Sequence, residues 1–168
     1  MTGFSVGAIF FVGQLASAAE PPELTPRPLG DGLWRVEVTV PTPLAEVQAC
    51  LKNPIEAAKL SPDITAIRYL SHGACDTLHA ETGGMVHVAY DYRRCATADG
   101  WHETLISSST LNAYDVRWRL TPVAAGTHIA YDLQIKPRFP APDFLFAPHM
   151  RNSMQTLLRR LYRKLTGG

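Results

Sequence analysis

The chain has 168 residues, of which 46% are hydrophobic and 18% charged, and its formal net charge at pH 7 is +1. This length and apolar content fit one folded domain with a sizeable core, and they exclude a disordered polar chain. A net charge so close to zero, without a basic DNA-reading motif, argues against a nucleic-acid partner, because such proteins neutralise many phosphates with Lys and Arg.

The amino-terminal stretch "FSVGAIFFVGQLASAA" at residues 4–19 is uncharged and mostly apolar. It contains Ala16-Ser17-Ala18, the small-x-small pattern that signal peptidase requires before its cut. We therefore predict a signal peptide over residues 1–18 and a periplasmic or secreted mature protein. The alternative is an uncleaved membrane anchor, although the apolar run is shorter than the roughly 20 residues of a spanning helix. No Lys or Arg precedes the run.

Residues 19–32 are rich in proline and polar side chains, and we expect an extended lead-in there that lies outside the core. The folded domain is predicted over residues 33–168. Its first segment, "LWRVEVTV" at residues 33–40, alternates apolar and polar residues as a half-buried strand does.

Two short helices are predicted next, and each has the same start signal. Thr42 is expected to cap the first helix with Pro43 at its first position, and Asn53 to cap the second with Pro54 at its first position. Glu56 stands where a capping box places its acidic residue.

From residue 64 the sequence reads as a series of strands separated by turn residues. The predicted strands are 64–71, 75–82, 86–95, 101–110, 114–121 and 127–136. Each clear case has one apolar face and one polar face, which is typical of an antiparallel sheet with one side in water. The apolar positions include Val88, Tyr90 and Tyr92, then Val116 and Trp118, then Ile129, Tyr131 and Leu133.

A long helix is predicted to close the chain, starting at about Pro142 or Pro148 and ending at Leu165. Its apolar stripe comprises Met150, Met154, Leu157, Leu158, Leu161 and Leu165. Its opposite face is basic and includes Arg159, Arg160, Arg163 and Lys164. Such a face is usually only solvated, but it is also a candidate for contact with an anionic membrane surface.

The three cysteines allow one disulfide and leave one thiol. Cys50 lies in a predicted helix and is expected to be a small buried residue. Cys75 and Cys95 flank a hairpin that turns at Gly83-Gly84. A three-residue turn would place them diagonally, roughly 7 Å apart, whereas a disulfide needs Cβ atoms about 3.8 Å apart. The Cys75–Cys95 bridge is therefore a candidate that requires a bulge or a frayed end.

Two long segments resemble a known superfamily. They are "VPTPLAEVQACLKNPIEAAKLSPDITAIRYL" and "GTHIAYDLQIKPRFPAPDFLFAPHMRNSMQTLLRRLYRKL". These segments are similar to the START-like superfamily, specifically its polyketide cyclase/dehydrase and coenzyme Q-binding branch. The resemblance covers about residues 33–165. It implies an α+β helix-grip fold, in which a curved antiparallel sheet of about seven strands carries two short helices and a long C-terminal helix.

The resemblance also implies a cavity for a hydrophobic ligand between the sheet and the last helix. Three prolines between residues 139 and 148 would hold bulky side chains near one end of that helix, as a pocket mouth needs. We therefore predict that the ligand-binding residues are Val88, Tyr90, Tyr92, Val116, Trp118, Ile129, Tyr131, Leu133, Phe144, Phe146, Met150 and Met154. The alternative is an ordinary packed core.

No catalytic constellation is evident. The six histidines lack metal-ligand spacing, and the sequence predicts neither a metal nor a cofactor. The favoured function is binding or transport of a lipid, quinone or polycyclic compound. A cyclase or dehydratase is the alternative, using Tyr90, Tyr92 or Tyr131 with His79 or Glu81 as proton carriers. A third possibility is an interaction module without a cavity.

Overall fold

The computed structural model describes residues 21–84, 87–140 and 142–167. The predicted signal peptide at residues 1–18 lies outside the described residues. The elements in chain order are β1 (Arg27–Gly30), β2 (Leu33–Val40), α1 (Leu44–Lys52), α2 (Pro54–Ala58), β3 (Ile64–Ser71), β4 (Cys75–Thr82), β5 (Val88–Thr97), β6 (Gly100–Ser108), β7 (Leu111–Val123), β8 (Gly126–Pro137) and α3 (Asp143–Thr166).

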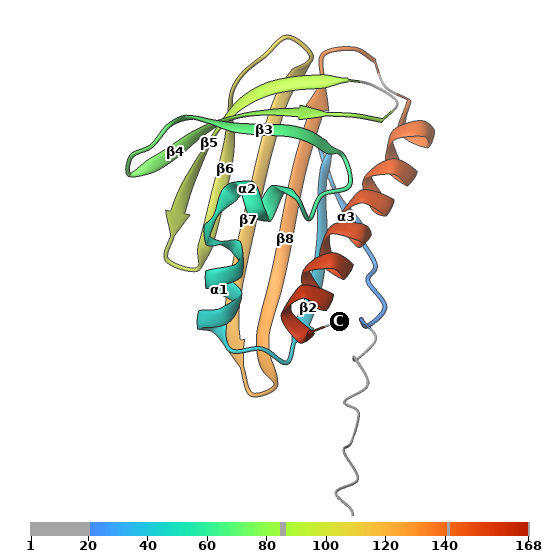
Figure 1. Ribbon diagram of the computed structural model, residues 1–168. Helices are drawn as coiled ribbons and strands as arrows, with labels where there is room; N and C mark the ends of the chain where they lie inside the picture. The colour runs from blue at the N-terminus through green and yellow to red at the C-terminus, as the bar shows by residue number, and fades with distance from the viewer. Residues whose placement is uncertain (1–20, 85–86, 141, 168) are drawn as a thin grey trace, which may run out of the picture.

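The strands form one antiparallel sheet in the order β1-β2-β8-β7-β6-β5-β4-β3. Consecutive strands from β3 to β8 are neighbours, and β2 returns to the sheet beside β8, so the first and last long strands pair. The sheet curves, and α3 runs along it as the longest helix of the molecule (Figure 1). The predicted α+β helix-grip fold is confirmed, with eight strands in place of about seven.

Alternation along the strands places the apolar side chains on the face toward the helices. In β2, Trp34, Val36, Val38 and Val40 are buried while Glu37 and Thr39 are exposed. The facing stripe of α3 buries Met150, Met154, Leu157, Leu158 and Leu161. All three helices therefore pack on the same face of the sheet.

The two short helices start by different means. Asn53 caps α2 as predicted, because its Oδ1 accepts hydrogen bonds from the backbone N–H of Ile55 (2.9 Å) and Glu56 (3.3 Å). The predicted Thr42 cap of α1 is wrong. Pro43 is the N-cap residue without a side-chain cap bond, and the Thr42 hydroxyl donates instead to the carbonyl of Leu165 at 3.2 Å. The Thr42 hydroxyl therefore makes a tertiary contact with α3 and does not cap α1, as the local sequence pattern had predicted it would.

The expectation that the whole lead-in lies outside the core is also wrong. Leu24 is only 1% exposed and belongs to the main hydrophobic cluster. Gln155 of α3 donates a side-chain hydrogen bond to the Leu24 carbonyl at 2.7 Å. The following residues form β1, which pairs with β2 and is the additional strand. The lead-in covers apolar surface between β2 and α3 that would otherwise face water.

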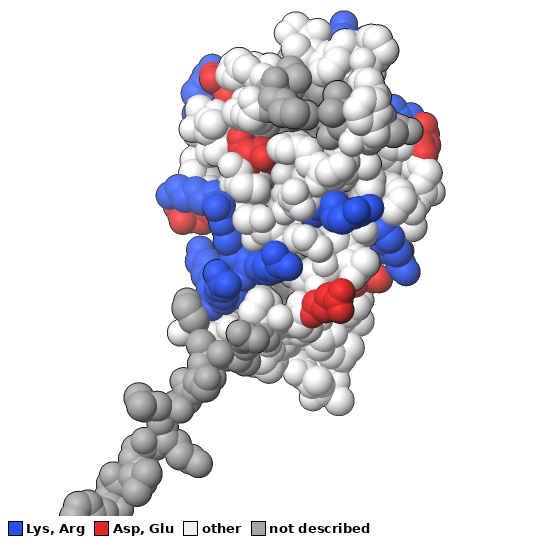
Figure 2. Space-filling view, turned by 90° about the vertical axis from the view of Figure 1, so that its right-hand side faces the viewer, with Lys and Arg blue, Asp and Glu red and all other residues white. Residues whose placement is uncertain are grey.

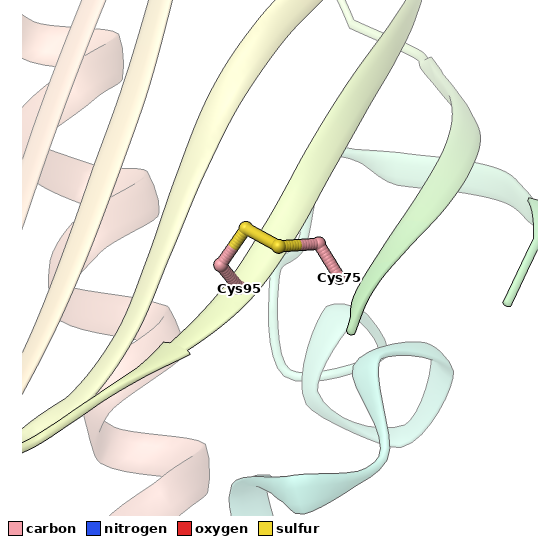
Figure 3. Close-up of a disulfide and its surroundings, with 2 residues drawn as sticks. All are labelled: Cys75 and Cys95. Atoms are coloured by element: carbon pink, nitrogen blue, oxygen red, sulfur yellow. A yellow bond between two sulfur atoms is a disulfide. The ribbon is translucent and has the colours of Figure 1, made fainter. Parts of the chain in front are cut away.

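Cys75 and Cys95 are joined by a disulfide between β4 and β5 (Figure 3). The last pair of this hairpin is Thr82 with Val88, so five residues connect the strands instead of three. This register places the two cysteines directly opposite each other, with Cα atoms 4.4 Å apart, and no bulge is required. Cys50 in α1 is a free, partly buried cysteine.

Within the described ranges, no helix is both long enough and apolar enough to cross a membrane.

Candidate ligand-binding cavity

A cavity of about 290 Å³ lies between the sheet, α2 and α3. It exists because the buried apolar residues form two clusters instead of one. The larger cluster joins the helices to β2, β7 and β8, and the smaller one lies on β4 and β5 around Leu78, Tyr90 and Tyr92. The curved sheet carries the second cluster away from α3, and the space between the two clusters stays open. Its walls are mostly apolar, with Trp118, Leu133, Ile135, Met150 and Met154 among the lining residues.

Four tyrosines line one wall. Tyr90, Tyr92 and Tyr114 form a group with ring centroids 4.7–5.8 Å apart, and Tyr131 packs on Trp118 at 4.4 Å. Burial raises the pKa of all four phenols well above the usual value near 10, and the negative charge of Glu103 raises it further. At neutral pH these tyrosines are therefore neutral hydrogen-bond donors and cannot accept a proton as phenolates.

A buried charge pair lies at the wall where β5 meets β6. Arg94 (4% exposed) and Glu103 (6% exposed) approach to 3.4 Å between Nη1 and Oε1. Arg94 Nη2 donates to the carbonyl of Leu51 at 2.6 Å, and the Tyr114 hydroxyl donates to Glu103 Oε2 at 2.7 Å. Arg94 Nε is buried and has no hydrogen-bond partner within the described part of the chain. Because both residues line the cavity, this end of a mostly apolar space is polar.

A second polar pair lies where α3 passes the segment before β3. His149 Nε2 is 3.6 Å from the carboxylate Oδ1 of Asp63, and both side chains line the cavity. Gly84, in the β4–β5 connection, has a positive φ of 111° and approaches His149, since a Cβ there would lie 3.8 Å from Cε1 of the ring. Three segments distant in sequence thus meet at this side of the cavity.

Phe139, Pro140, Pro142 and Phe146 complete the lining near the start of α3. Phe139 remains 41% exposed, so the wall at this end is in contact with solvent. The proline-broken segment therefore lies at the cavity, as its sequence indicated.

The structure brings most of the predicted ligand-binding residues to the cavity. The lining includes Val88, Tyr90, Tyr92, Trp118, Tyr131, Leu133, Phe146, Met150 and Met154. Three predicted residues lie elsewhere. Val116 and Ile129 are packed in the larger core cluster, and Phe144 points outward with 74% of its surface exposed. Val116 and Ile129 face inward as expected, but other core side chains cover them, which a strand pattern does not reveal.

His79 and Glu81, considered as proton carriers, do not line the cavity. They alternate with the buried Leu78 and Ala80 along β4 and so lie on the outer face of the sheet. There the His79 ring bonds to Asp91 at 2.7 Å. No proton carrier of this kind faces the tyrosines from β4.

Sequence reasoning missed Arg94, Glu103, Tyr114, Asp63 and His149. A signal was present for the first, because Arg94 follows Tyr90 and Tyr92 in the same alternation and so belongs to the inward face. Tyr114 precedes Val116 and Trp118 in the same way. No local signal marks Asp63 or His149, since their proximity depends on how α3 crosses the sheet.

Across the described segments, no group of three or more His, Cys, Asp and Glu side chains is arranged to hold a metal ion. Arg159, Arg160, Arg163 and Lys164 are all exposed on α3, away from the cavity lining.

A family model described as polyketide cyclase / dehydrase and lipid transport matches residues 34–166. A comparison with curated proteins found no match. Several solved structures are similar in fold. A START superfamily protein from Mycobacterium smegmatis is 12% identical, with 79% of this chain and 96% of that chain covered and a TM-score of 0.67.

Two further similar structures have different described roles. The Zhui aromatase/cyclase from Streptomyces sp. R1128 is 18% identical, over 77% of this chain and 92% of that one, with a TM-score of 0.61. A STAR-related lipid transfer protein from Xanthomonas axonopodis is 14% identical, over 84% and 98%, with a TM-score of 0.63. At these identities the likeness concerns the fold, which serves both enzymes and carriers.

Proposed function

The chain belongs to the polyketide cyclase/dehydrase and lipid transport family, and from this premise we propose that it binds a small hydrophobic molecule with at least one polar group in the cavity. The observation that carries the proposal is the cavity itself, which is lined by apolar and tyrosine side chains and has a buried Arg94–Glu103 pair in its wall. A volume of about 290 Å³ is near the lower end of the roughly 300–1,000 Å³ found for small-molecule sites.

The apolar walls would supply most of the affinity. Burial of apolar ligand surface contributes roughly 25 cal/mol per Å² before the costs of association. The hydroxyls of Tyr90, Tyr92 and Tyr131, which line the cavity, can donate hydrogen bonds to a ligand oxygen. A carbonyl, phenol or carboxylate group on a lipid, quinone or polycyclic molecule would satisfy this requirement.

A binding role is favoured over catalysis by the state of the tyrosines. Their raised pKa values prevent them from acting as general bases near neutral pH, where efficient proton transfer needs a pKa close to the working pH. The cyclase or dehydratase alternative would use His149, Asp63 or Glu103 as proton carriers, which also line the cavity. We further propose that the domain acts in the periplasm or outside the cell, a proposal supported by the signal-like sequence at residues 4–18.

The test measures ligand affinity by Trp fluorescence. Apolar species that co-purify from the native host are identified by mass spectrometry and then titrated into ligand-free protein. Tyr90→Phe and Tyr131→Phe should each weaken binding by up to about tenfold, as expected for one hydrogen bond. Leu133→Glu should abolish binding, because it places an unpaired carboxylate against the apolar part of the ligand.

Two control variants accompany this test. Ile106→Glu makes the same chemical change at an exposed position (47% exposed) and should leave binding unchanged. Ile135→Trp fills the cavity without adding charge and should also prevent binding if Leu133→Glu does not fold. Unchanged affinity in Ile135→Trp would refute binding in this cavity. Turnover of the co-purified molecule that is lost in His149→Gln, with binding retained, would establish the enzyme alternative instead.

A further inference from the structure

The outer face of α3 carries a concentration of positive charge that the cavity does not explain. Arg159, Arg160, Arg163 and Lys164 are exposed, and with 3.6 residues per turn they cover an arc of about 140°. No acidic residue occurs in α3 after Asp143. Lys59, just after α2, is exposed and lies on the adjoining surface. These five residues are called the basic patch.

Contacts between α2 and α3 join these side chains into one surface. Arg160 Nη1 donates to the carbonyl of Leu60 at 3.4 Å. Lys59 binds Glu56 at 2.5 Å, and the hydrogen bond and charge of Lys59, together with the charge of Lys164, lower the pKa of Glu56. Lys and Arg gather accordingly at the lower left of Figure 2, which looks onto this side of the molecule.

The rest of the surface is organised differently. Most cations of the sheet are paired with acids, as in Arg35 and Arg119 with Asp132 and Lys136 with Asp31. In contrast, the four α3 cations of the basic patch form no ion pair with any residue of 21–84, 87–140, 142, 144 or 146–167. The helix dipole favours cations only in the last turn, which holds Arg163 and Lys164. It does not account for Arg159 or Arg160, which precede that turn.

We propose that the basic patch docks the protein on an anionic lipid surface. Binding to such a surface requires a positive potential on the protein but little shape complementarity. Each Lys or Arg near the surface adds to the affinity. No large hydrophobic side chain is exposed in the part of α3 that carries the patch, so the contact is superficial and electrostatic. A single-stranded nucleic acid would require exposed aromatic side chains for base stacking, which this part of α3 does not present.

The position of the patch relates docking to the cavity. Ala57 and Ala58 of α2 and Leu157 of α3 line the cavity, and the basic patch lies at the junction of these two helices. A docked protein therefore holds the α2–α3 side of its cavity near the lipids. Docking itself does not depend on what the cavity binds.

The test is co-sedimentation of the full mature chain with vesicles. Vesicles of phosphatidylcholine mixed with phosphatidylglycerol should bind the protein, vesicles of phosphatidylcholine alone should not, and added salt should release it. The triple variant Arg159→Glu, Arg163→Glu, Lys164→Glu should bind more weakly by a factor of at least about 100, since each lost cation removes roughly a fivefold factor and each Glu adds repulsion. Replacement of the same three residues by Gln should weaken binding in the same direction and keeps the test valid if the Glu variant misfolds.

A matched control reverses the charge of three exposed cations of the sheet, with the substitutions Arg68→Glu, Arg93→Glu and Arg117→Glu. Its net charge changes by the same amount as in the triple Glu variant of the basic patch. It should retain most vesicle binding. Equal loss in this control would show that only net charge matters and would overturn the proposal, as would binding that neither salt nor the patch variants reduce. Equal affinity for soluble heparin would reject a lipid surface in favour of polyanions in general. The Ile135→Trp variant, whose cavity is filled, should still bind the vesicles. This result distinguishes docking on a membrane from binding of a ligand in the cavity.

Discussion

At the scale of single residues, Arg94 and Glu103 are the most consequential side chains of the cavity wall. Both charges are buried, so each has lost its hydration and depends on the other and on neighbouring hydrogen bonds. Removing one partner leaves a buried charge uncompensated, whereas removing both charges does not. Their contribution to stability is therefore strongly coupled.

We expect Arg94→Met to lower the free energy of unfolding by about 3–5 kcal/mol. The double variant Arg94→Met, Glu103→Met should recover most of this loss, because apolar side chains of similar size can replace a buried ion pair. Urea unfolding of the wild type, of Arg94→Met, of Glu103→Met and of the double variant measures the coupling between the two residues. If the double variant loses the sum of the unfolding free energies lost by the two single variants, the two residues are not coupled. Ligand binding should remain impaired even where stability is recovered.

The buried tyrosines predict a specific sensitivity to alkaline pH. Burial raises the pKa of Tyr90 above its value near 10 in the unfolded chain. The folded state holds the proton more tightly, so the stability that this residue contributes is complete below about pH 10 and is lost as the pH rises further. Tyr90→Phe should make the fall in unfolding free energy above about pH 10 less steep, as measured by urea unfolding at a series of pH values. An unchanged slope would contradict a buried, protonated phenol.

At the scale of elements, the β4–β5 hairpin combines local pattern with a covalent link. Its cysteines are 20 positions apart in sequence and directly opposed in register. Closing a loop of this length stabilises a protein by about 3 kcal/mol in the chain-entropy model. The disulfide also holds the strand end beside Arg94, whose neighbour in sequence is Cys95.

Reduction, or the double variant Cys75→Ser, Cys95→Ser, should lower the melting temperature by roughly 6–12 °C. Differential scanning calorimetry with and without reductant measures this shift. Thiol titration of the unfolded, non-reduced protein should find one free thiol, from Cys50. Three free thiols would show that the bridge does not form in the protein tested. Cys50→Ser serves as the control and should respond to reductant as the wild type does.

The elements also show where local sequence is sufficient. Strand alternation and the Asn53-Pro54 signal predicted β2–β8 and α2 to within a few residues, because these patterns reflect burial and capping at the same positions. The α1 cap and the role of Leu24 were predicted wrongly, because Thr42 and Leu24 both make contacts with α3. Contacts between segments more than a hundred residues apart leave no local pattern.

At the scale of the whole molecule, the position of the domain in the cell is a prediction from the amino-terminal residues. Export followed by cleavage after Ala18 should give a mature protein that begins at Ala19. Amino-terminal sequencing of the protein isolated from its host measures this directly. Soluble cytoplasmic protein that retains Met1 would contradict export. Ala16→Arg should block cleavage and provides the matched control.

The sequence by itself determined the order of the elements from β2 to α3, the inward face of each long strand, the apolar stripe of α3 and the resemblance to a hydrophobic-ligand family. The periodicity of apolar residues indicates which side chains are buried. It does not depend on which distant residues those side chains contact. It could not determine which buried side chains meet a cavity and which meet each other. Ile129 and Tyr131 have the same pattern, yet the first is packed in the core and the second lines the cavity.

Only the tertiary structure decided the polar parts of the site and the extent of the basic patch. Arg94 meets Glu103 across β5 and β6, Asp63 meets His149 at one side of the cavity, and Lys59 joins the cations of α3. The first arrangement depends on the register of β5 and β6 and the other two on the path of α3, because charges interact through space and not along the chain. The curvature of the sheet separates the two hydrophobic clusters and leaves the cavity between them.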